Sequence, residues 1–155
     1  MIILNPKHLI QKFMSHTCQA IVFNCMDFRF HSAVRDFLVS NGLKDNYDLV
    51  SLAGVTKGLA DNDPTSSEII LKQIEISQKL HGIKGVILIH HMDCGAYGGH
   101  KAFENLQSEH DKQTHDLTQA KKIIRGKFPR LEVKKIIARI EEKDGGSLID
   151  FEAID

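Results

Sequence analysis

Short apolar runs alternate with amphipathic stretches along nearly the whole chain, and this alternation limits the possible folds more than any other feature. Strands are expected at 19–24, 47–52, 86–89, 135–141 and 147–154. Helices are expected at 29–40, 65–81 and 115–128, after a short one that begins at Asn5-Pro6. Within this pattern, Thr65-Ser66-Ser67-Glu68 resembles a capping box, and Asp144-Gly145-Gly146 is typical of a hairpin turn.

The order of these elements predicts an α/β fold. Strands that alternate with helices form a parallel sheet covered on both faces, and the final hairpin adds an antiparallel edge strand. We therefore expect a three-layer, mostly parallel sheet with the order 2-1-3-4 and helices on both faces. A chain of 155 residues without a repeat or linker suits one domain over residues 1–155.

Composition excludes several classes of partner. The 20 Lys and Arg residues balance the 20 Asp and Glu residues, so no net positive charge favours nucleic acid or an acidic membrane. The opening apolar run, Met1-Ile2-Ile3-Leu4, is too short for a signal peptide or a membrane span. An odd number of cysteines favours free thiols or metal ligands in a reducing, cytoplasmic compartment.

Candidate chemistry follows the first and third strands. Cys25 directly follows the first strand, and the third is followed by His91-Met92-Asp93-Cys94. In a 2-1-3-4 sheet these ends meet where the strand order reverses, which is where such sheets bind ligands. Two thiols and an imidazole suit Zn²⁺ and leave a fourth position for water. The alternative is ordinary buried thiols beside a loop histidine.

Other residues could join this group. Cys18 precedes the strand that Cys25 follows, about 20 Å away at roughly 3.3 Å per residue, so it cannot be the fourth ligand. His90 and His91 are adjacent, so in an extended segment only one reaches the metal, and the spacing to Cys94 favours His91.

Asp27 and Arg29 stand two residues apart after the first strand, on the same side as Cys25 if the backbone stays extended. The carboxylate of Asp27 could then accept a hydrogen bond from a zinc-bound water, and Arg29 could hold it ionised through a two-pronged pair. A surface ion pair at a helix start is the alternative interpretation.

Cys25-Met26-Asp27-Phe28-Arg29, followed by His91-Met92-Asp93-Cys94-Gly95, resembles the β-class carbonic anhydrases, in particular their compact bacterial members. The resemblance covers nearly the whole chain. It implies one Zn²⁺ per chain held by Cys25, His91 and Cys94, and an Asp27–Arg29 dyad. It also implies reversible hydration of CO₂ to bicarbonate, through zinc-bound hydroxide oriented by the dyad, in a homodimer or a dimer-based oligomer.

The residues expected at the substrate pocket are Phe28, Ala53, Gly54, Gly95 and Tyr97. Phe28 stands where the family usually has a small polar residue, and Ser51-Leu52 replaces the usual Arg-Asn before Ala53-Gly54. The large apolar Phe28 leaves open hydrolysis of carbonyl sulfide or carbon disulfide on the same zinc site. A non-catalytic zinc-binding homologue or bicarbonate sensor also stays open, as does a flavodoxin-like nucleotide-binding domain that holds no metal.

Overall fold

The structure is a computed structural model and describes residues 16–143 and 145–155. The helix expected to begin at Asn5-Pro6 lies outside the described residues, and so does Asp144 at the expected hairpin turn. All other predicted elements fall within the described part of the chain and can be compared with the structure.

A five-stranded sheet with the order β2-β1-β3-β4-β5 forms the centre of the fold. Its strands are β1 (Ala20–Asn24), β2 (Tyr47–Ser51), β3 (Gly85–His91), β4 (Glu132–Lys143) and β5 (Gly146–Ile154). The strands β2, β1, β3 and β4 pair in parallel, and β5 pairs with β4 antiparallel. The predicted α/β class, the order 2-1-3-4 and the antiparallel edge strand are confirmed.

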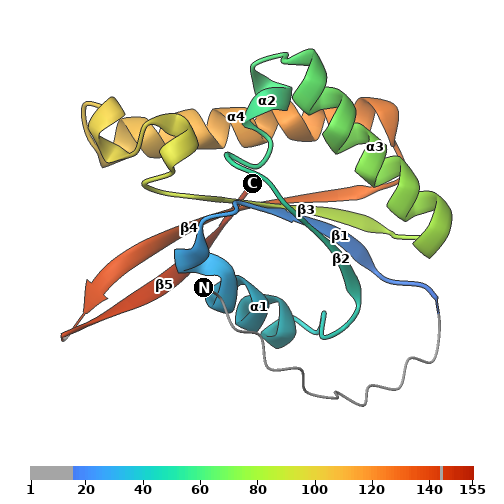
Figure 1. Cartoon of the computed structure of the whole chain (residues 1–155), viewed down its shortest axis with the longest axis horizontal. Coiled ribbons are helices and arrows are strands. Elements are labelled where there is room, and N and C mark those ends of the chain that lie inside the picture. Colours follow the sequence, from blue (N-terminus) through green and yellow to red (C-terminus); the bar gives the residue numbers. More distant parts are fainter. Residues whose placement is uncertain (1–15, 144) are drawn as a thin grey trace, which may run out of the picture.

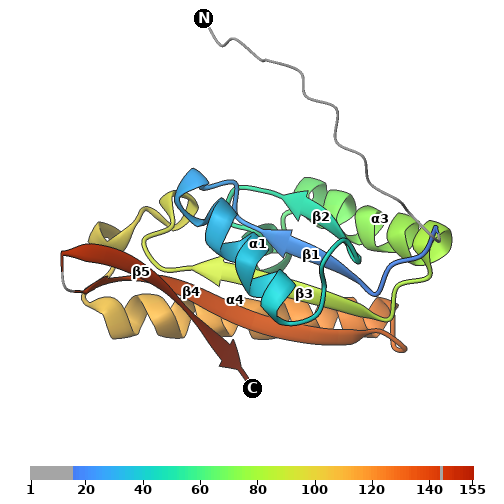
Figure 2. The ribbon, with the colours of Figure 1, turned by 90° about the horizontal axis from the view of Figure 1, so that it is seen from below.

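Helices cover both faces of the sheet, as predicted. The α-helices are α1 (His31–Ser40), α2 (Lys57–Ala60), α3 (Pro64–His81) and α4 (Leu106–Lys127). Short 3₁₀ helices are η1 (Phe28–Phe30), η2 (Gly95–Tyr97) and η3 (His100–Ala102). In Figure 1, α2, α3 and α4 lie on one side of the sheet, and α1 lies on the other. Figure 2 shows α1 from its own side, crossing the sheet over β1 and β3.

Burial of β1 explains why the sheet is a firm support for residues at its edge. All five residues of β1 are buried, because helices cover both of its faces. Ile21 and Phe23 belong to the core under α3 and α4, whereas Ala20 and Val22 pack with residues of α1. Each fully buried large aliphatic or aromatic side chain contributes roughly 1.5–3 kcal/mol to folding. The end of β1 is therefore held from both sides.

The largest difference from the sequence-based expectation is the start of α4, which begins at Leu106 rather than near residue 115. Asn105 caps the helix, because its side chain accepts a hydrogen bond from the backbone N–H of Ser108 at 2.9 Å. The early turns bury the polar residues Glu109 and Gln113 in place of apolar ones. The apolar period that identifies a helix therefore begins later than the helix itself.

Two other helix starts also differ from expectation. Asp63, not Thr65, caps α3, because its carboxylate accepts a hydrogen bond from the backbone N–H of Ser66 at 2.8 Å. Pro64 occupies the first helical position, where its missing N–H has no cost. Arg29, expected to open a helix, lies in the 3₁₀ turn η1, and α1 begins at His31.

The β4–β5 hairpin extends beyond the rest of the sheet. The pairing of β4 with β3 ends at Ala138, opposite His91. Residues 139–143 of β4 pair with β5 alone among the described strands. The far end of the hairpin consequently projects past the other strands in Figure 1.

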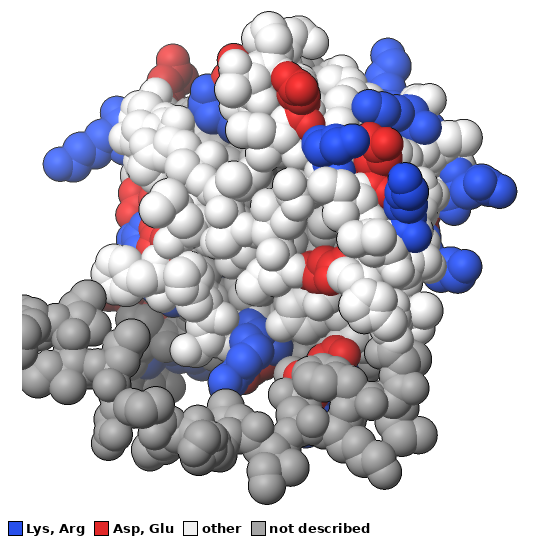
Figure 3. All heavy atoms as spheres, turned by 45° about the vertical axis from the view of Figure 1, so that its right-hand side comes forward, with Lys and Arg blue, Asp and Glu red and all other residues white. Residues whose placement is uncertain are grey.

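The described surface combines both signs of charge. On the face in Figure 3, Lys and Arg side chains stand among Asp and Glu side chains toward the upper right, and the broad centre of this face carries few charged side chains. Within the described residues, every helix is too short or too polar to pass through a bilayer.

Candidate metal centre

The carboxyl ends of β1 and β3 bring the predicted metal ligands together. These strands are neighbours, with Asn24 opposite Ile89. Cys25 directly follows β1, His91 is the last residue of β3, and Cys94 precedes η2. All three predicted ligands are buried. Their convergence results from the strand order, because the carboxyl ends of adjacent parallel strands share one edge of the sheet.

The geometry of this group fits a metal ion. The ligand atoms of Cys25, His91 and Cys94 lie within 4.8 Å of one another, and the two sulfurs are 3.9 Å apart. The Nδ1 atom of His91 donates a hydrogen bond to the Met92 carbonyl oxygen at 2.8 Å, so Nε2 of the neutral ring carries a lone pair. Among the described residues, this buried Nε2 atom has no hydrogen-bond partner. A buried lone pair beside two thiols is the donor set that tetrahedral Zn²⁺ prefers.

The two thiols affect each other's ionisation. The hydrogen bond with Cys94 lowers the pKa of Cys25 below the ordinary thiol range. The same contact, with burial, raises the pKa of Cys94. Without a metal, the pair therefore retains one proton. A cation bound by both sulfurs would displace that proton, because the thiolate is the form that binds metal.

Asp27 and Arg29 form a tight pair beside this group. Asp27 caps η1, and its Oδ1 atom accepts a hydrogen bond from the backbone N–H of Arg29 at 3.0 Å. The guanidinium of Arg29 donates to the same carboxylate from Nε at 3.0 Å and from Nη2 at 2.7 Å. These bonds lower the pKa of Asp27 to about 2, so it is ionised at neutral pH.

The 3₁₀ turn changes how Asp27 reaches the metal ligands. From the sequence, Asp27 and Arg29 are expected on the same side as Cys25 on the condition that the backbone stays extended. The structure does not meet this condition, because residues 28–30 turn into η1. The carboxylate nevertheless lies close to the group, with Oδ2 of Asp27 3.9 Å from Nε2 of His91. Asp27 therefore stands next to the position that an ion between the ligands would occupy.

Asp93 holds Arg29 from the other side and is a residue that sequence reasoning missed. Nη1 of Arg29 donates to Oδ2 of Asp93 at 3.0 Å, and Nη2 donates to the Asp93 backbone carbonyl at 3.1 Å. Asp93 has a φ of 57°, in the left-handed region that few side chains adopt. The carboxylates of Asp27 and Asp93 thus fix the guanidinium between the loops after β1 and β3.

The first turns of α4 support the loop that carries Cys94. The buried side chain of Glu109 accepts a hydrogen bond from the backbone N–H of Asp93 at 2.6 Å and also contacts Nδ1 of His100. The side-chain amide of Gln113 donates to the His91 carbonyl oxygen at 2.8 Å. Glu109 and Gln113 are four residues apart, so they lie on one face of the helix. That spacing is the sequence signal that could have identified them.

His90 does not belong to the metal group. It is buried, and its Nε2 atom lies 3.0 Å from the hydroxyl oxygen of Thr56. Burial lowers the pKa of His90 to about 3, so its ring is neutral at neutral pH. The adjacent histidines therefore separate as expected from alternation along a strand, and His91 is the one near the thiols.

An open pocket of about 490 Å³ lies in front of Cys25 and Asp27. Its other lining residues are Met26, Phe28, Arg29, Ala53, Gly95 and Ala96. The Phe28 side chain is 82% exposed, so it forms part of the rim rather than the floor. The pocket therefore has apolar residues in the same lining as the Asp27 carboxylate and Cys25.

Two residues expected at the pocket lie behind it. Gly54 has a φ of 68°, and a Cβ there would come within 2.8 Å of the Ala96 Cβ, so only glycine suits this close approach. Its backbone N–H also contributes, after Cys94 and His91, to lowering the pKa of Cys25. Tyr97 is buried, and its hydroxyl donates to Asp116 at 2.9 Å, away from the residues that line the pocket.

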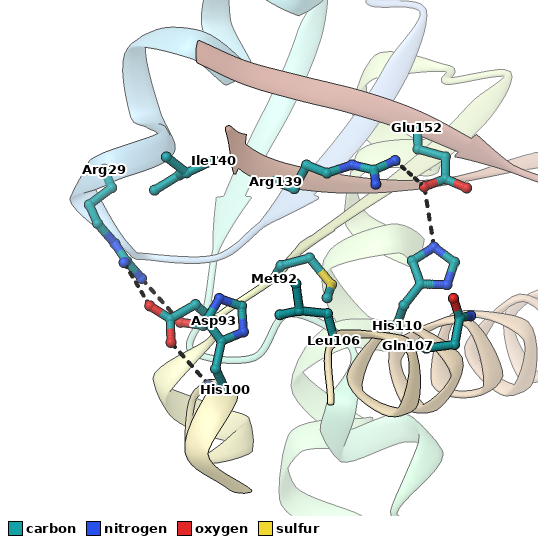
Figure 4. A pocket seen from close by; sticks show the side chains of 10 residues that line it. All are labelled: Arg29, Met92, Asp93, His100, Leu106, Gln107, His110, Arg139, Ile140 and Glu152. Carbon is teal, nitrogen blue, oxygen red and sulfur yellow. Dashed lines mark hydrogen bonds and ion pairs between the residues drawn. The ribbon is translucent and has the colours of Figure 1, made fainter. Parts of the chain in front are cut away.

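A second cavity, of about 610 Å³, adjoins the site between α4 and the β4–β5 hairpin. Figure 4 shows Arg29 paired with Asp93 at one end of it and Arg139 paired with Glu152 at the other. Arg29 lines both cavities and therefore lies where they adjoin.

These features define a class: an α/β protein with a Cys/His/Cys candidate metal centre at the switch point of its sheet and an Asp/Arg pair beside it. Residues 15–142 match the family described as "Putative carbonic anhydrase". The chain belongs to this family.

Two rickettsial proteins are similar in sequence, and both are described as uncharacterized. One, from Rickettsia bellii (strain RML369-C), is 38% identical over 117 residues, which cover 73% of this chain and 71% of that protein. The other, from Rickettsia conorii (strain ATCC VR-613 / Malish 7), is 34% identical over 73% of this chain and 63% of its own length. A KaiC-like protein from Pyrococcus horikoshii OT3 aligns with a TM-score of 0.33 and 13% identity, over 87% of this chain and 66% of its own, a likeness too weak to support an argument.

Proposed function

We propose that the chain is a zinc-dependent enzyme of the β-class of carbonic anhydrases that interconverts CO₂ and bicarbonate. The observation that carries this proposal is the buried Nε2 atom of His91, which has no hydrogen-bond partner within the described part of the chain. It is grouped with the sulfurs of Cys25 and Cys94 and lies next to the Asp27 carboxylate that Arg29 holds. Membership of the carbonic anhydrase family supports the same reaction.

Cys25, His91 and Cys94 would hold the ion, and the position left open toward the pocket would be available to water. A bound Zn²⁺ would supply Lewis acidity, which lowers the pKa of water and provides a nucleophile near neutral pH. Gln113 and Met92 contribute by bonding to the backbone and ring of His91, which fixes the ring and its tautomer.

Asp27 would orient the attacking oxygen. An ionised carboxylate can only accept a hydrogen bond, so Asp27 would accept one from the O–H of the attacking water and leave the oxygen lone pair free to react. Arg29 keeps Asp27 ionised, because its bonds to the carboxylate lower the pKa of Asp27 to about 2. In the net reaction, water adds to the carbon of CO₂, and one proton leaves to solvent as bicarbonate forms.

Stopped-flow measurement of CO₂ hydration tests this proposal, on protein whose zinc content has been verified. The measurement runs from about pH 6.5 to about pH 9, because this range brackets the pKa near 7 of water bound at strongly acidifying zinc sites. We expect a zinc-dependent rate that Asp27→Asn lowers by roughly 10²–10⁴-fold. Stoichiometric zinc without turnover at any pH would overturn the proposal and would favour a non-catalytic homologue or a bicarbonate sensor.

Hydrolysis of carbonyl sulfide or carbon disulfide is the second candidate activity. Met26 and Phe28 favour it, because these exposed side chains add apolar and polarizable groups to the pocket that Asp27 lines. Sulfide release from either substrate, at a rate above that of CO₂ hydration, would assign the site to this chemistry instead.

We also propose that two copies of the chain associate at this pocket. Met26 and Phe28 are large apolar side chains in an exposed position, and a second chain over them would remove that surface from water. Light scattering of the wild type and of Phe28→Ser tests this. A dimer that Phe28→Ser weakens is expected, and a monomeric wild type would contradict it.

We place the enzyme in the cytoplasm, because its chemistry needs reduced thiols. The sulfurs of Cys25 and Cys94 are 3.9 Å apart, so oxidation of the metal-free pair would need only a modest shift. The resulting disulfide would remove both sulfur ligands, so a reducing compartment keeps the metal-free chain able to bind its ion. Fractionation of cells that express the chain tests this, and recovery from an oxidising compartment would contradict it.

A further inference from the structure

A second group of metal-binding side chains lies at the opposite end of the sheet. Cys18 precedes β1, Asp48 is the second residue of β2, and His81 is the last residue of α3. Their ligand atoms lie within 4.8 Å of one another. Cys18 and Cys25 are seven residues apart on either side of β1, so at roughly 3.3 Å per residue this group lies about 20 Å from the candidate metal centre.

Backbone pairing brings the three segments together. The backbone N–H of Cys18 donates to the carbonyl oxygen of His81 at 3.1 Å. The parallel pairing of β1 with β2 places Tyr47, which adjoins Asp48, opposite Ala20. These bonds fix the side chains as neighbours although the segments are far apart in sequence.

Side-chain bonds orient the carboxylate in this group. The Ser77 hydroxyl donates to Oδ2 of Asp48 at 2.6 Å, and Nδ1 of His81 lies 2.7 Å from the same oxygen. Carboxylates that bind metals are commonly held by an outer hydrogen bond of the kind that Ser77 provides. Nδ1 of His81 would have to move roughly 0.6–0.7 Å farther from Asp48, since nitrogen and oxygen ligands of tetrahedral zinc lie roughly 3.3–3.4 Å apart.

The group is open to solvent on one side. The side chains of His81 and Asp48 are 27% and 29% exposed, and Cys18 is partly buried. An ion could therefore enter without opening the core. A nearby fourth donor is also present, because the ring of His16 meets that of His81 edge-on with centroids 4.9 Å apart.

We propose that Cys18, Asp48 and His81 form a second zinc site, with His16 or water as its fourth ligand. Thiolate, imidazole and carboxylate are the three side-chain ligand types of zinc, and here each comes from a different segment. The site links the start of β1, β2 and the end of α3, and its role is structural. Its existence does not depend on the proposed CO₂ chemistry.

Zinc stoichiometry distinguishes this proposal from a simple hydrogen-bonded cluster. Full-length protein equilibrated with Zn²⁺ and then desalted is assayed for metal and protein content, in the wild type, Cys18→Ala and His81→Gln. The exposed His31, outside both groups, provides the matched control His31→Gln. We expect Cys18→Ala and His81→Gln each to bind one equivalent fewer than the wild type and His31→Gln to bind the same number. An unchanged stoichiometry in Cys18→Ala overturns the proposal.

Cobalt gives a second readout that does not depend on counting. The chain has 3 cysteines, so in the double variant Cys25→Ser/Cys94→Ser the thiol of Cys18 is the one that remains. We expect this variant, loaded with Co²⁺, to show a thiolate-to-cobalt charge-transfer band that adding Cys18→Ala abolishes. Absence of the band in the folded double variant, checked by circular dichroism, contradicts a site at Cys18.

CO₂ hydration separates the two proposals. Cys18→Ala should lose one zinc equivalent and keep the hydration rate of the wild type, because Cys18 is remote from the pocket. If no form of the protein hydrates CO₂, the proposed function fails, but the zinc difference between Cys18→Ala and the wild type still decides the second site.

Discussion

The two Cys- and His-containing groups at opposite ends of the sheet differ in how well their polar atoms are satisfied. At the carboxyl end, the buried Nε2 atom of His91 has no hydrogen-bond partner among the described residues. At the amino end, the Asp48 carboxylate already contacts Ser77 and His81. An unsatisfied buried polar group costs about 1–3 kcal/mol. The first group therefore depends on a ligand for completion, whereas the second can exist with or without one.

The variant expected to have the largest effect is Cys25→Ser, which removes one thiolate from the buried group. We expect CO₂ hydration to fall to the uncatalysed rate and one equivalent of zinc to be lost, because hydroxyl is a poor zinc ligand. Stopped-flow assay and metal analysis check this, with Cys18→Ala as the cysteine control for the hydration rate and His31→Gln as the control for zinc content. Undiminished hydration by Cys25→Ser would show that the chemistry lies elsewhere.

Asp27→Asn should have the next largest effect, on turnover but not on metal. Loss of the ionised acceptor should lower kcat by roughly 10²–10⁴-fold, the usual range for a positioned acid or base, at unchanged zinc content. Asp36→Asn is a matched control, because Asp36 pairs with Arg35 on exposed α1. Equal rates for Asp27→Asn and Asp36→Asn would remove Asp27 from the mechanism.

Gln113→Ala tests whether α4 supports the buried group at Cys25 without affecting the group at Cys18. Without the bond to the His91 carbonyl, zinc affinity there should fall about 10–100-fold, as for other outer partners of metal ligands. Competition with a chromophoric chelator measures this. Gln107→Ala, on the exposed start of the same helix, should leave affinity unchanged. A change at the Cys18 group in Gln113→Ala would show that the two ends are coupled.

Ser77→Ala should have the smallest effect, confined to the amino end. Removing the hydroxyl that orients Asp48 should weaken cobalt binding at Cys18 by about 10-fold. It should also lower the free energy of unfolding by about 1 kcal/mol, the usual net value of one hydrogen bond. Titration of the charge-transfer band and urea unfolding measure these, with Ser67→Ala on the same helix as control. If Ser77→Ala lowered CO₂ hydration more than it lowered cobalt binding, the groups at Cys18 and Cys25 would not be independent.

Much of the fold and the buried group follows from sequence because its signals are local. Apolar runs predict β1 and β3, and strand order then brings Cys25 near His91 and Cys94. Asp93 is different, since its role depends on a left-handed turn that no periodicity reveals. Glu109 is hidden for a related reason: it is a buried polar residue in a helix whose early turns lack an apolar stripe.

The amino-end group is harder to predict than the buried one. Sequence reasoning separates Cys18 from Cys25 by the length of β1, and the structure places them in different groups. The partners of Cys18 come from β2 and from the end of α3, and they are brought together by pairing between segments rather than by a spaced motif. Asp48 also lies in a strand, and from sequence alone a carboxylate in a strand is expected to face solvent rather than to belong to a metal site.

The extension of β4 past Ala138 has a consequence for solubility. Along residues 139–143, one edge of β4 has no neighbouring strand in the described part of the chain, so its backbone N–H and C=O groups could template a strand from another molecule. Charged residues along this edge oppose such pairing, because a second copy pairing in register would bring like charges together; they are Arg139, Glu141, Glu142 and Lys143. The hairpin that lengthens the sheet thus carries its own protection against edge-to-edge aggregation.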